Sequence, residues 1–323
     1  MTSDISMDSL RILYDLPLLE LVFKAAEVHR KHFDQHEIQL CTLLSVKTGG
    51  CAEDCSYCPQ AARYNTDVER EKLLDVEKVL QEATVAKHEG STRFCMGAAW
   101  REVKDNQDFD NILKMVKGVR KLGLEACCTL GMLSLSQAEK LKEAGLTAYN
   151  HNLDTSEDYY GDIIKTRTYN DRLETLDNVG KAGISVCCGG IIGLGESVDD
   201  RLKLLLTLTK LSPQPESVPI NTLVPVPGTP LENQKRVDTF EWIRMIALAR
   251  IVLPKSKIRL SAGRLDIPKE AQALAFMAGA NSIFTGEKLL TTGNPSWNSD
   301  HALIQELGLS IKAPEQEMEY AKV

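Results

Sequence analysis

The segment at residues 49–60, GGCAEDCSYCPQ, constrains this chain more than any other. Its cysteines, Cys51, Cys55 and Cys58, follow a C-x-x-x-C-x-x-C spacing, so three thiolates can converge on one soft metal centre. A structural zinc site normally has a fourth Cys or His nearby, but the next such residue is His88. A four-iron cluster usually takes four thiolates, so three would leave one iron open to a substrate. A zinc knuckle is the alternative for this motif alone.

The composition is that of an ordinary globular protein and argues against several classes of function. Of the 323 residues, 43% are hydrophobic and 26% charged, and the net charge of −7 argues against nucleic acid as the main partner. No apolar run approaches the length of a membrane span, and the charged residues Asp4, Asp8 and Arg11 are not typical of a signal peptide. Nine cysteines without an export signal therefore indicate a cytoplasmic protein that uses thiols for metal binding rather than disulfides.

Short apolar runs alternate with longer amphipathic stretches from about residue 40 onward, which indicates an α/β fold. Eight such units predict a (β/α)8 TIM-type barrel with an N-terminal helical extension, and a doubly wound open sheet is the alternative. The expected strands are 40–48, 92–98, 124–130, 148–153, 184–192, 218–224, 257–262 and 282–285. We expect residues 1–39 to form an N-terminal helical cap, 40–292 the barrel, and 293–323 a C-terminal helical segment with a polar tail.

Three of the expected strands carry further cysteines: Cys95, the pair Cys127-Cys128 and the pair Cys187-Cys188. Successive side chains of a strand point to opposite faces, so only one member of each pair can face the barrel interior. Active sites of TIM barrels lie at the carboxyl ends of the strands, which is where the three-cysteine loop falls. Three strands could thus deliver one thiol each into the same interior, with buried packing as the alternative.

Polar residues on other strands indicate a ligand in the same interior. Asn150, Asn152 and Asp154 share one face of the fourth strand, and Asn221 on the sixth has the same character. A barrel interior is normally filled with branched apolar residues, so these groups need polar partners. A ligand is one source of partners, and bracing of strand ends by Asn150 and Asn152 is the alternative. An inward Arg259 on the seventh strand must also be paired.

The three-cysteine loop resembles the signature of the radical S-adenosylmethionine (SAM) superfamily, in which three cysteines hold a [4Fe-4S] cluster and SAM chelates the open iron. Longer segments are similar to the biotin synthase family within that superfamily. They are STRFCMGAAW at 91–100, YNHNLDT at 149–155, VPIN at 218–221 and RLSAGR at 259–264, and the match runs from about residue 40 to residue 292. The resemblance implies a sulfurtransferase that inserts sulfur into dethiobiotin to form biotin.

The same resemblance implies a set of site residues and partners. The metal ligands are Cys51, Cys55 and Cys58 for the [4Fe-4S] cluster, and Cys95, Cys127, Cys187 and Arg259 for a second, [2Fe-2S] cluster. The SAM-binding residues are Tyr57, Asn152, Asp154, Ile191 and Glu196, and the dethiobiotin-binding residues are Asn150 and Asn221. No catalytic residue is expected beyond the cluster ligands, and buried packing is the default for Cys41, Cys128 and Cys188. A flavodoxin-type electron donor and a homodimer are implied as partners.

Two alternatives stay open. Another radical SAM enzyme, such as a hydrogenase-maturation or lipoyl-synthase-like enzyme, would share the three-cysteine loop, although the segments on strands four and seven argue against it. A non-catalytic iron-sulfur electron carrier would keep four cysteines on each cluster and would not need a polar barrel interior.

Overall fold

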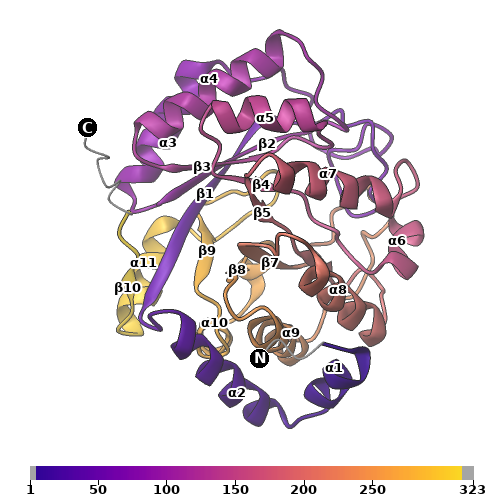
Figure 1. Cartoon of the computed structure of the whole chain (residues 1–323), viewed down its shortest axis with the longest axis vertical. Helices are drawn as coiled ribbons and strands as arrows, with labels where there is room; N and C mark the ends of the chain where they lie inside the picture. Colours follow the sequence, from indigo (N-terminus) through magenta and orange to yellow (C-terminus); the bar gives the residue numbers. More distant parts are fainter. Residues whose placement is uncertain (1–4, 315–323) are drawn as a thin grey trace.

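A closed barrel of eight parallel strand positions forms the centre of the computed structural model, which describes residues 5–314 (Figure 1). The strands follow the order β1-β2-β3-β4-β5-β7-β8-β9, and β1 pairs with β9 to close the ring. β6 pairs with β7 and continues the position that β5 begins. The predicted TIM-type barrel is confirmed, and the alternative of an open doubly wound sheet is wrong.

The bounds of the elements are as follows. The strands are β1 Glu37–Lys47, β2 Arg93–Ala98, β3 Glu125–Thr129, β4 Ala148–Asn150, β5 Ser185–Cys187, β6 Gly190–Ile192, β7 Ser217–Thr222, β8 Lys257–Leu260, β9 Ser282–Thr285 and β10 Ser310–Ile311. The helices are α1 Met7–Tyr14, α2 Leu18–His32, α3 Val76–His88, α4 Gln107–Lys121, α5 Leu135–Glu143, α6 Glu157–Ile163, α7 Tyr169–Lys181, α8 Val198–Lys210, α9 Thr239–Val252, α10 Lys269–Met277 and α11 Trp297–Glu306, with a 3-10 turn η1 at Arg264–Asp266.

Two helices precede the barrel, and they pack on its outer layer (Figure 1). Pro17 separates α1 from α2, since proline lacks the backbone N–H that a continuous helix would need. α2 packs against α9, while β10 pairs in parallel with the start of β1. Among residues 5–314, none of the helices is long and apolar enough to cross a membrane.

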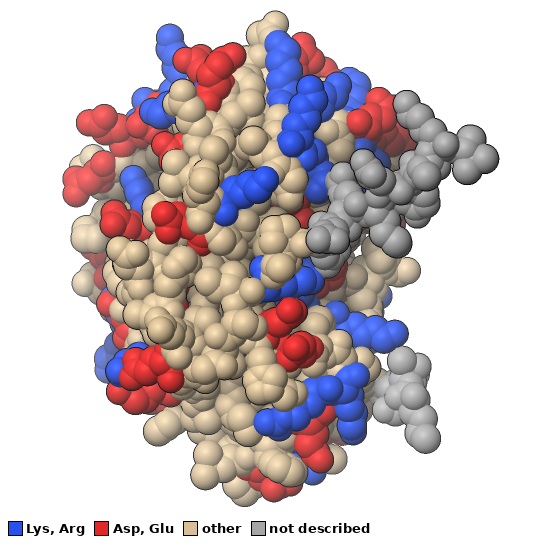
Figure 2. All heavy atoms as spheres, turned by 90° about the vertical axis from the view of Figure 1, so that its left-hand side faces the viewer, with Lys and Arg blue, Asp and Glu red and all other residues tan. Residues whose placement is uncertain are grey.

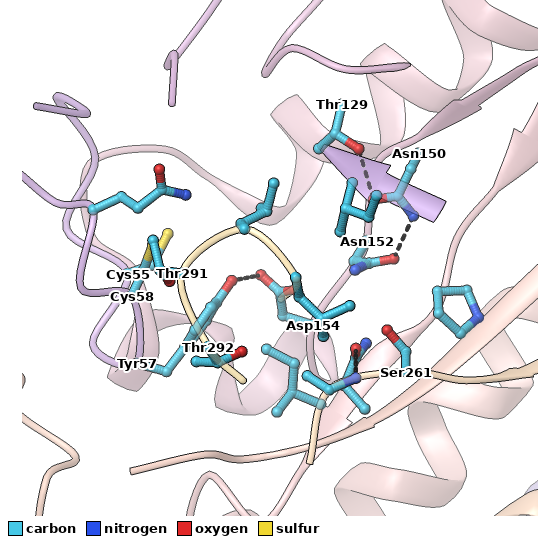
Figure 3. Close-up of a pocket in the computed structure, with 18 of the residues that line it drawn as sticks. Cys55, Tyr57, Cys58, Thr129, Asn150, Asn152, Asp154, Ser261, Thr291 and Thr292 are labelled. Carbon is cyan, nitrogen blue, oxygen red and sulfur yellow. Dashed lines mark hydrogen bonds between the residues drawn. The ribbon is translucent and has the colours of Figure 1, made fainter. Parts of the chain in front are cut away.

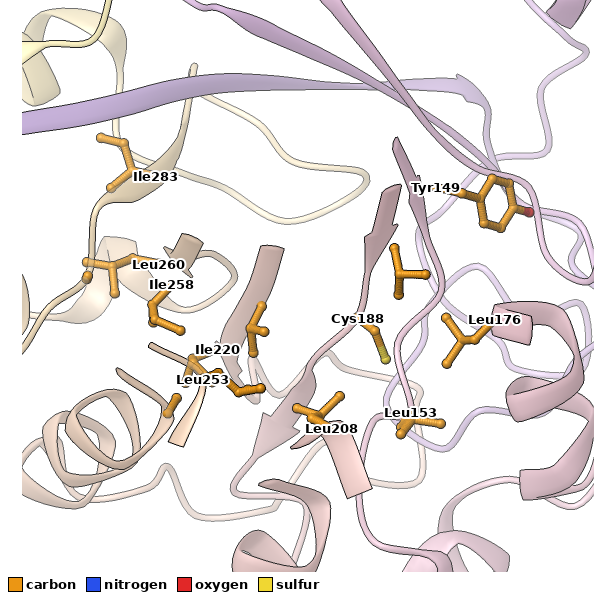
Figure 4. Close-up of a cluster of buried hydrophobic side chains, with 14 of the residues drawn as sticks. Tyr149, Leu153, Leu176, Cys188, Leu208, Ile220, Leu253, Ile258, Leu260 and Ile283 are labelled. Carbon is orange, nitrogen blue, oxygen red and sulfur yellow. The ribbon is translucent and has the colours of Figure 1, made fainter. Parts of the chain in front are cut away.

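The hydrophobic core divides into an outer core and an inner core. The outer core fills the layer between the strands and the helices, and it contains Cys128 and Cys188. Figure 4 shows Cys188 near Leu176 and Leu208. The inner core lies inside the barrel and consists of Cys41, Cys95, Cys127, Ala148, Phe284 and Leu289. Cys187 lines the cavity inside the barrel, as Cys127 does. Each cysteine pair therefore sends one thiol outward and one inward, which confirms the prediction from the alternation of the strands.

A network of charged side chains closes the amino-terminal end of the barrel. Arg93 at the start of β2 is fully buried, and its guanidinium pairs with Glu125 at 2.6 Å and with both carboxylate oxygens of Glu216 at 3.0 and 3.1 Å. Lys257 at the start of β8 binds Glu216 at 2.6 Å. Because this end is closed, a ligand has to enter from the opposite end, where the three-cysteine loop lies.

We expect the Glu216→Gln variant to lose about 2 kcal/mol of unfolding free energy at neutral pH, because the buried Arg93 would lack its bidentate partner. Burial alone would raise the pKa of Glu216, but the ion pairs with Arg93 and Lys257 outweigh it and lower the pKa to about 2. The stabilisation by this carboxylate is therefore complete above the ordinary pKa of a glutamate and is lost as the pH falls through about 2.

Urea unfolding at a series of acidic pH values tests this expectation. The unfolding free energies of the wild type and of Glu216→Gln should converge as the pH falls. Asp177→Asn is the control, because it removes only an exposed ion pair with Lys181 and should change stability far less. Equal stability of Glu216→Gln and the wild type at neutral pH would contradict the role given to Glu216.

On the face drawn in Figure 2, acidic and basic side chains are interspersed.

Candidate active site

The three-cysteine loop follows β1 and folds back on itself through backbone hydrogen bonds. The Cys51 amide donates to the Gln60 carbonyl and the Cys58 amide to the Cys55 carbonyl, both at 2.9 Å. Gly49 has a φ of 68°, and a Cβ there would lie 2.5 Å from the Glu69 carbonyl oxygen. Only glycine fits this position, so Gly49 fixes how the loop leaves the strand.

The loop is anchored on the segment that follows α6. Asp54 accepts hydrogen bonds from the backbone amides of Lys165 at 2.9 Å and Thr166 at 3.0 Å. The Ser56 hydroxyl donates to the Ile163 carbonyl at 2.9 Å. The buried Glu53 accepts from the Thr166 hydroxyl, so two acidic residues between the first two cysteines hold the loop in place.

The three loop thiols fit an iron-sulfur cluster in their chemistry. Burial raises the pKa of Cys55 to about 11; burial and the neighbouring Cys55 raise that of Cys58 to about 12; burial also raises that of Cys51. Thiols this basic need a strong positive charge to release their protons, which iron supplies when it binds. Across residues 5–314, no group of three His, Cys, Asp or Glu side chains is placed so that it could hold a single metal ion.

One cavity of about 300 Å³ opens beside this loop and continues into the barrel. At its outer end it is lined by the three loop cysteines and Tyr57. Cys55, Cys58 and Tyr57 are drawn in Figure 3. At its inner end it is lined by Cys95, Cys127, Cys187 and Arg259. Both predicted groups of cluster ligands therefore face the same enclosed space.

A buried chain of hydrogen bonds connects the outer end of the cavity to the barrel wall. The Tyr57 hydroxyl donates to Asp154 at 2.7 Å (Figure 3). Arg172 on α7 pairs with the same carboxylate oxygen at 2.5 Å. Arg172 also donates to the Tyr160 hydroxyl at 2.8 Å and to the Asn152 carbonyl. Asp154 holds a left-handed φ of 68°, which turns its carboxylate toward the loop.

The predicted asparagines line the cavity and also brace the strands. The Asn150 amide donates to Asn152 at 3.1 Å and to Cys187 Sγ at 3.3 Å, and Asn150 accepts from the Thr129 hydroxyl at 3.2 Å (Figure 3). Asn221 donates to the Gly190 carbonyl at 2.9 Å and accepts from the Ala262 amide at 3.2 Å. The bracing alternative and the ligand alternative are therefore compatible, since each side chain has neighbours and still faces the cavity.

The inner thiols surround a buried guanidinium. Cys95 donates a hydrogen bond to Cys127, and this bond and burial raise the pKa of Cys95. Arg259 Nη1 lies 3.7 Å from Cys187 Sγ, and the guanidinium stacks 5.0 Å from the centre of the Phe284 ring. Arg259 Nη2 is buried and has no hydrogen-bond partner. An unsatisfied donor among three thiols fits a site that takes an anionic group such as a [2Fe-2S] cluster.

All predicted site residues except Glu196 line the cavity. The Glu196 carboxylate instead accepts hydrogen bonds from the Gly193 amide at 2.8 Å and from Arg201 at 2.6 Å. Its predicted contact with SAM stays a prediction. The cavity is also lined by residues that were not predicted, from the last barrel loop and from α7, namely Leu289, Leu290, Thr291, Thr292 and Arg172.

Comparison with known proteins identifies the family. A model of the radical SAM superfamily matches residues 45–208, and a model of the biotin and thiamin synthesis associated domain matches residues 219–310. The biotin synthase of Myxococcus xanthus (strain DK1622) is 63% identical over 314 residues, covering 97% of this chain and 91% of that protein. The biotin synthase of Cytophaga hutchinsonii is 62% identical, covering 94% of this chain and 90% of that protein.

Solved structures show the same fold at much lower identity. Methylornithine synthase (PylB) has a TM-score of 0.82 at 20% identity, covering 97% of this chain and 96% of that one. HydG, a maturase of the [FeFe]-hydrogenase, has a TM-score of 0.81 at 18% identity, covering 96% of this chain and 72% of that one. These two likenesses concern the fold alone, whereas the high identity to the curated relatives over nearly the whole chain shows that this protein belongs to the biotin synthase family of radical SAM enzymes.

Proposed function

We propose that this radical SAM enzyme inserts sulfur into dethiobiotin to form biotin. The observation that carries the proposal is the single cavity with a three-cysteine loop at its outer end and three further cysteines at its inner end. A substrate between these two groups would face a radical source on one side and a sulfur source on the other. An electron carrier has no need of such a space or of the asparagines that line it.

Membership of the superfamily implies a [4Fe-4S] cluster and SAM, and we propose Cys51, Cys55 and Cys58 as the cluster ligands. When bound, this cluster supplies the electron that cleaves SAM into methionine and a 5′-deoxyadenosyl radical. The buried part of the loop, Glu53 to Cys55, would help to keep water from that radical. We propose the cavity-facing Tyr57, Asn152, Asp154 and Ile191, together with Glu196, as the SAM site.

The ribose hydroxyls of SAM need hydrogen-bond acceptors, and the carboxylate of Asp154 and the amide of Asn152 offer them. Arg172 holds Asp154 in place, because it donates a hydrogen bond to one of its two carboxylate oxygens. We propose Asn150 and Asn221 as dethiobiotin-binding residues, since amide groups can both donate to and accept from a polar ring.

A [2Fe-2S] cluster held by Cys95, Cys127, Cys187 and Arg259 is the proposed sulfur source. The inward direction of these thiols and the unsatisfied Arg259 Nη2 support this assignment. We also propose a flavodoxin-type electron donor, a homodimer, a cytoplasmic location, and a division into residues 1–39, 40–292 and 293–323, of which 1–4 and 315–323 lie outside the described residues.

The proposal is tested by anaerobic reconstitution with iron and sulfide, followed by SAM, dethiobiotin and reductant. We expect biotin to form while the [2Fe-2S] absorption and Mössbauer signals decay. Cys95→Ala should keep the [4Fe-4S] cluster and SAM cleavage but stop biotin formation, whereas Cys128→Ala, in the outer core, should keep both. SAM cleavage without biotin in the wild type would point to another substrate, and normal biotin formation by Cys95→Ala would remove Cys95 from the inner site.

A further inference from the structure

A fourth thiol lies inside the barrel beside the proposed [2Fe-2S] ligands. Cys41 on β1 is fully buried and belongs to the inner core with Cys95 and Cys127. Its partners across the strands are Arg93 on β2 and Phe284 on β9. The site described above gives this thiol no role.

Cys41 is linked to Arg259 through one hydroxyl group. Cys41 Sγ lies 3.6 Å from Ser282 Oγ, and the same oxygen accepts a hydrogen bond from Arg259 Nε at 2.9 Å. Arg259 lines the cavity, whereas Cys41 and Ser282 lie behind that lining. Removal of the arginine side chain would therefore open the inner end of the cavity toward Cys41.

The two candidates for a fourth ligand differ in their chemistry. A thiolate is a soft donor and an ordinary ligand of iron, and four thiolates are the usual set for a [2Fe-2S] cluster. A guanidinium stays protonated under ordinary conditions, so it can bind iron only if it gives up a proton. Cys41 therefore offers the better donor atom, and Arg259 has the more direct position.

We propose that Cys41 is a fourth thiolate ligand available to the [2Fe-2S] cluster of the inner site, called the inner cluster below, and can take the place of Arg259. The inference rests on the proposed function, because it requires a [2Fe-2S] cluster in the inner site. The exchange is a ligand substitution without electron transfer: Cys41 gives up its thiol proton as its sulfur binds iron, and the guanidinium takes up a proton as it leaves. The inner cluster can then be held by Cys41, Cys95, Cys127 and Cys187 alone.

The test compares Arg259→Ala, Arg259→Ala/Cys41→Ser and the matched control Arg259→Ala/Cys128→Ser. Cys128 is as fully buried as Cys41 but packs in the outer hydrophobic core, between the strands and the helices. Iron content, sulfide content and Mössbauer spectra after anaerobic reconstitution measure both clusters without an activity assay. We expect the Cys41→Ser double variant to hold roughly tenfold less inner cluster than the other two, a loss typical of a damaged metal site. The [4Fe-4S] content should be equal in all three and reports correct folding.

The single variant Arg259→Ala gives a second measurement that does not depend on the double variant. With four thiolates, both irons of the inner cluster have the same donor set, so their Mössbauer signals should coincide. Loss of the inner cluster from Arg259→Ala would overturn the assignment of Cys41, as would equal inner-cluster content in Arg259→Ala and Arg259→Ala/Cys41→Ser. A wild type without any inner cluster would instead refute the proposed [2Fe-2S] site, and the role of Cys41 with it.

Discussion

Replacement of Cys55 by alanine is expected to abolish the reductive cleavage of SAM, with a loss of more than ~100-fold in rate, beyond that typical of a mutated residue around a metal site. Cys55 is buried, faces the cavity, and lies between the other two thiols of the loop in the sequence. With two thiolates instead of three, one iron of the cluster would lose its thiolate ligand, because the loop at residues 49–60 holds no fourth cysteine. The rate of 5′-deoxyadenosine formation with dithionite as the reductant measures the effect.

The matched control for this variant is Cys128→Ala. Both residues are free, buried thiols, but Cys128 packs among apolar side chains between the barrel and its helices. The Cys128→Ala variant should therefore bind the full complement of iron and cleave SAM at the wild-type rate. If Cys55→Ala also kept the cluster and formed 5′-deoxyadenosine normally, the three-cysteine loop would not be the cluster site.

Most of the barrel could be predicted from the sequence, because buried parallel strands read as short apolar runs separated by helical stretches. The alternation of side chains predicted that each cysteine pair, Cys127-Cys128 and Cys187-Cys188, has one inward thiol, and the resemblance to the family supplied which member it is. The expected strand 148–153 ends at Asn150 in the structure. The expected strand 184–192 is divided into β5 and β6, and the break includes Gly189, where a Cβ would collide with the Pro219 carbonyl oxygen.

The missed residues come from contacts between segments that are far apart in the sequence. Arg172 lies on a helix, where a charged residue is normally exposed, and only the folded chain brings it to Asp154. Thr291 and Thr292 reach the cavity from the loop after β9, whose sequence carries no motif. Cys41 read as a packing residue because the direction of a lone thiol depends on the register of its strand.

The second large effect is expected for Asp154→Asn. Asparagine has nearly the same shape and tolerates the left-handed φ of 68°, so the substitution removes the charge while it keeps the backbone. Arg172 would then be a buried cation without its counter-ion, which costs about 3 kcal/mol of stability. The charge-assisted bond from Tyr57 and the proposed bonds to the SAM ribose would also weaken, so we expect SAM to bind about tenfold to 100-fold less tightly.

A loss of stability alone could mimic a loss of binding, and Asp300→Asn separates the two. Asp300 forms an equally buried ion pair with Arg264, with two bonds of 2.7 Å, but it touches neither Tyr57 nor the three-cysteine loop. Both variants should unfold at lower urea concentrations, and only Asp154→Asn should weaken SAM binding to protein with a full [4Fe-4S] content. If the two variants lose SAM affinity equally, Asp154 acts through the stability of the barrel, and its place in the SAM site is wrong. If Asp154→Asn alone loses it, the carboxylate joins the loop, the helix α7 and the ligand through contacts of its own.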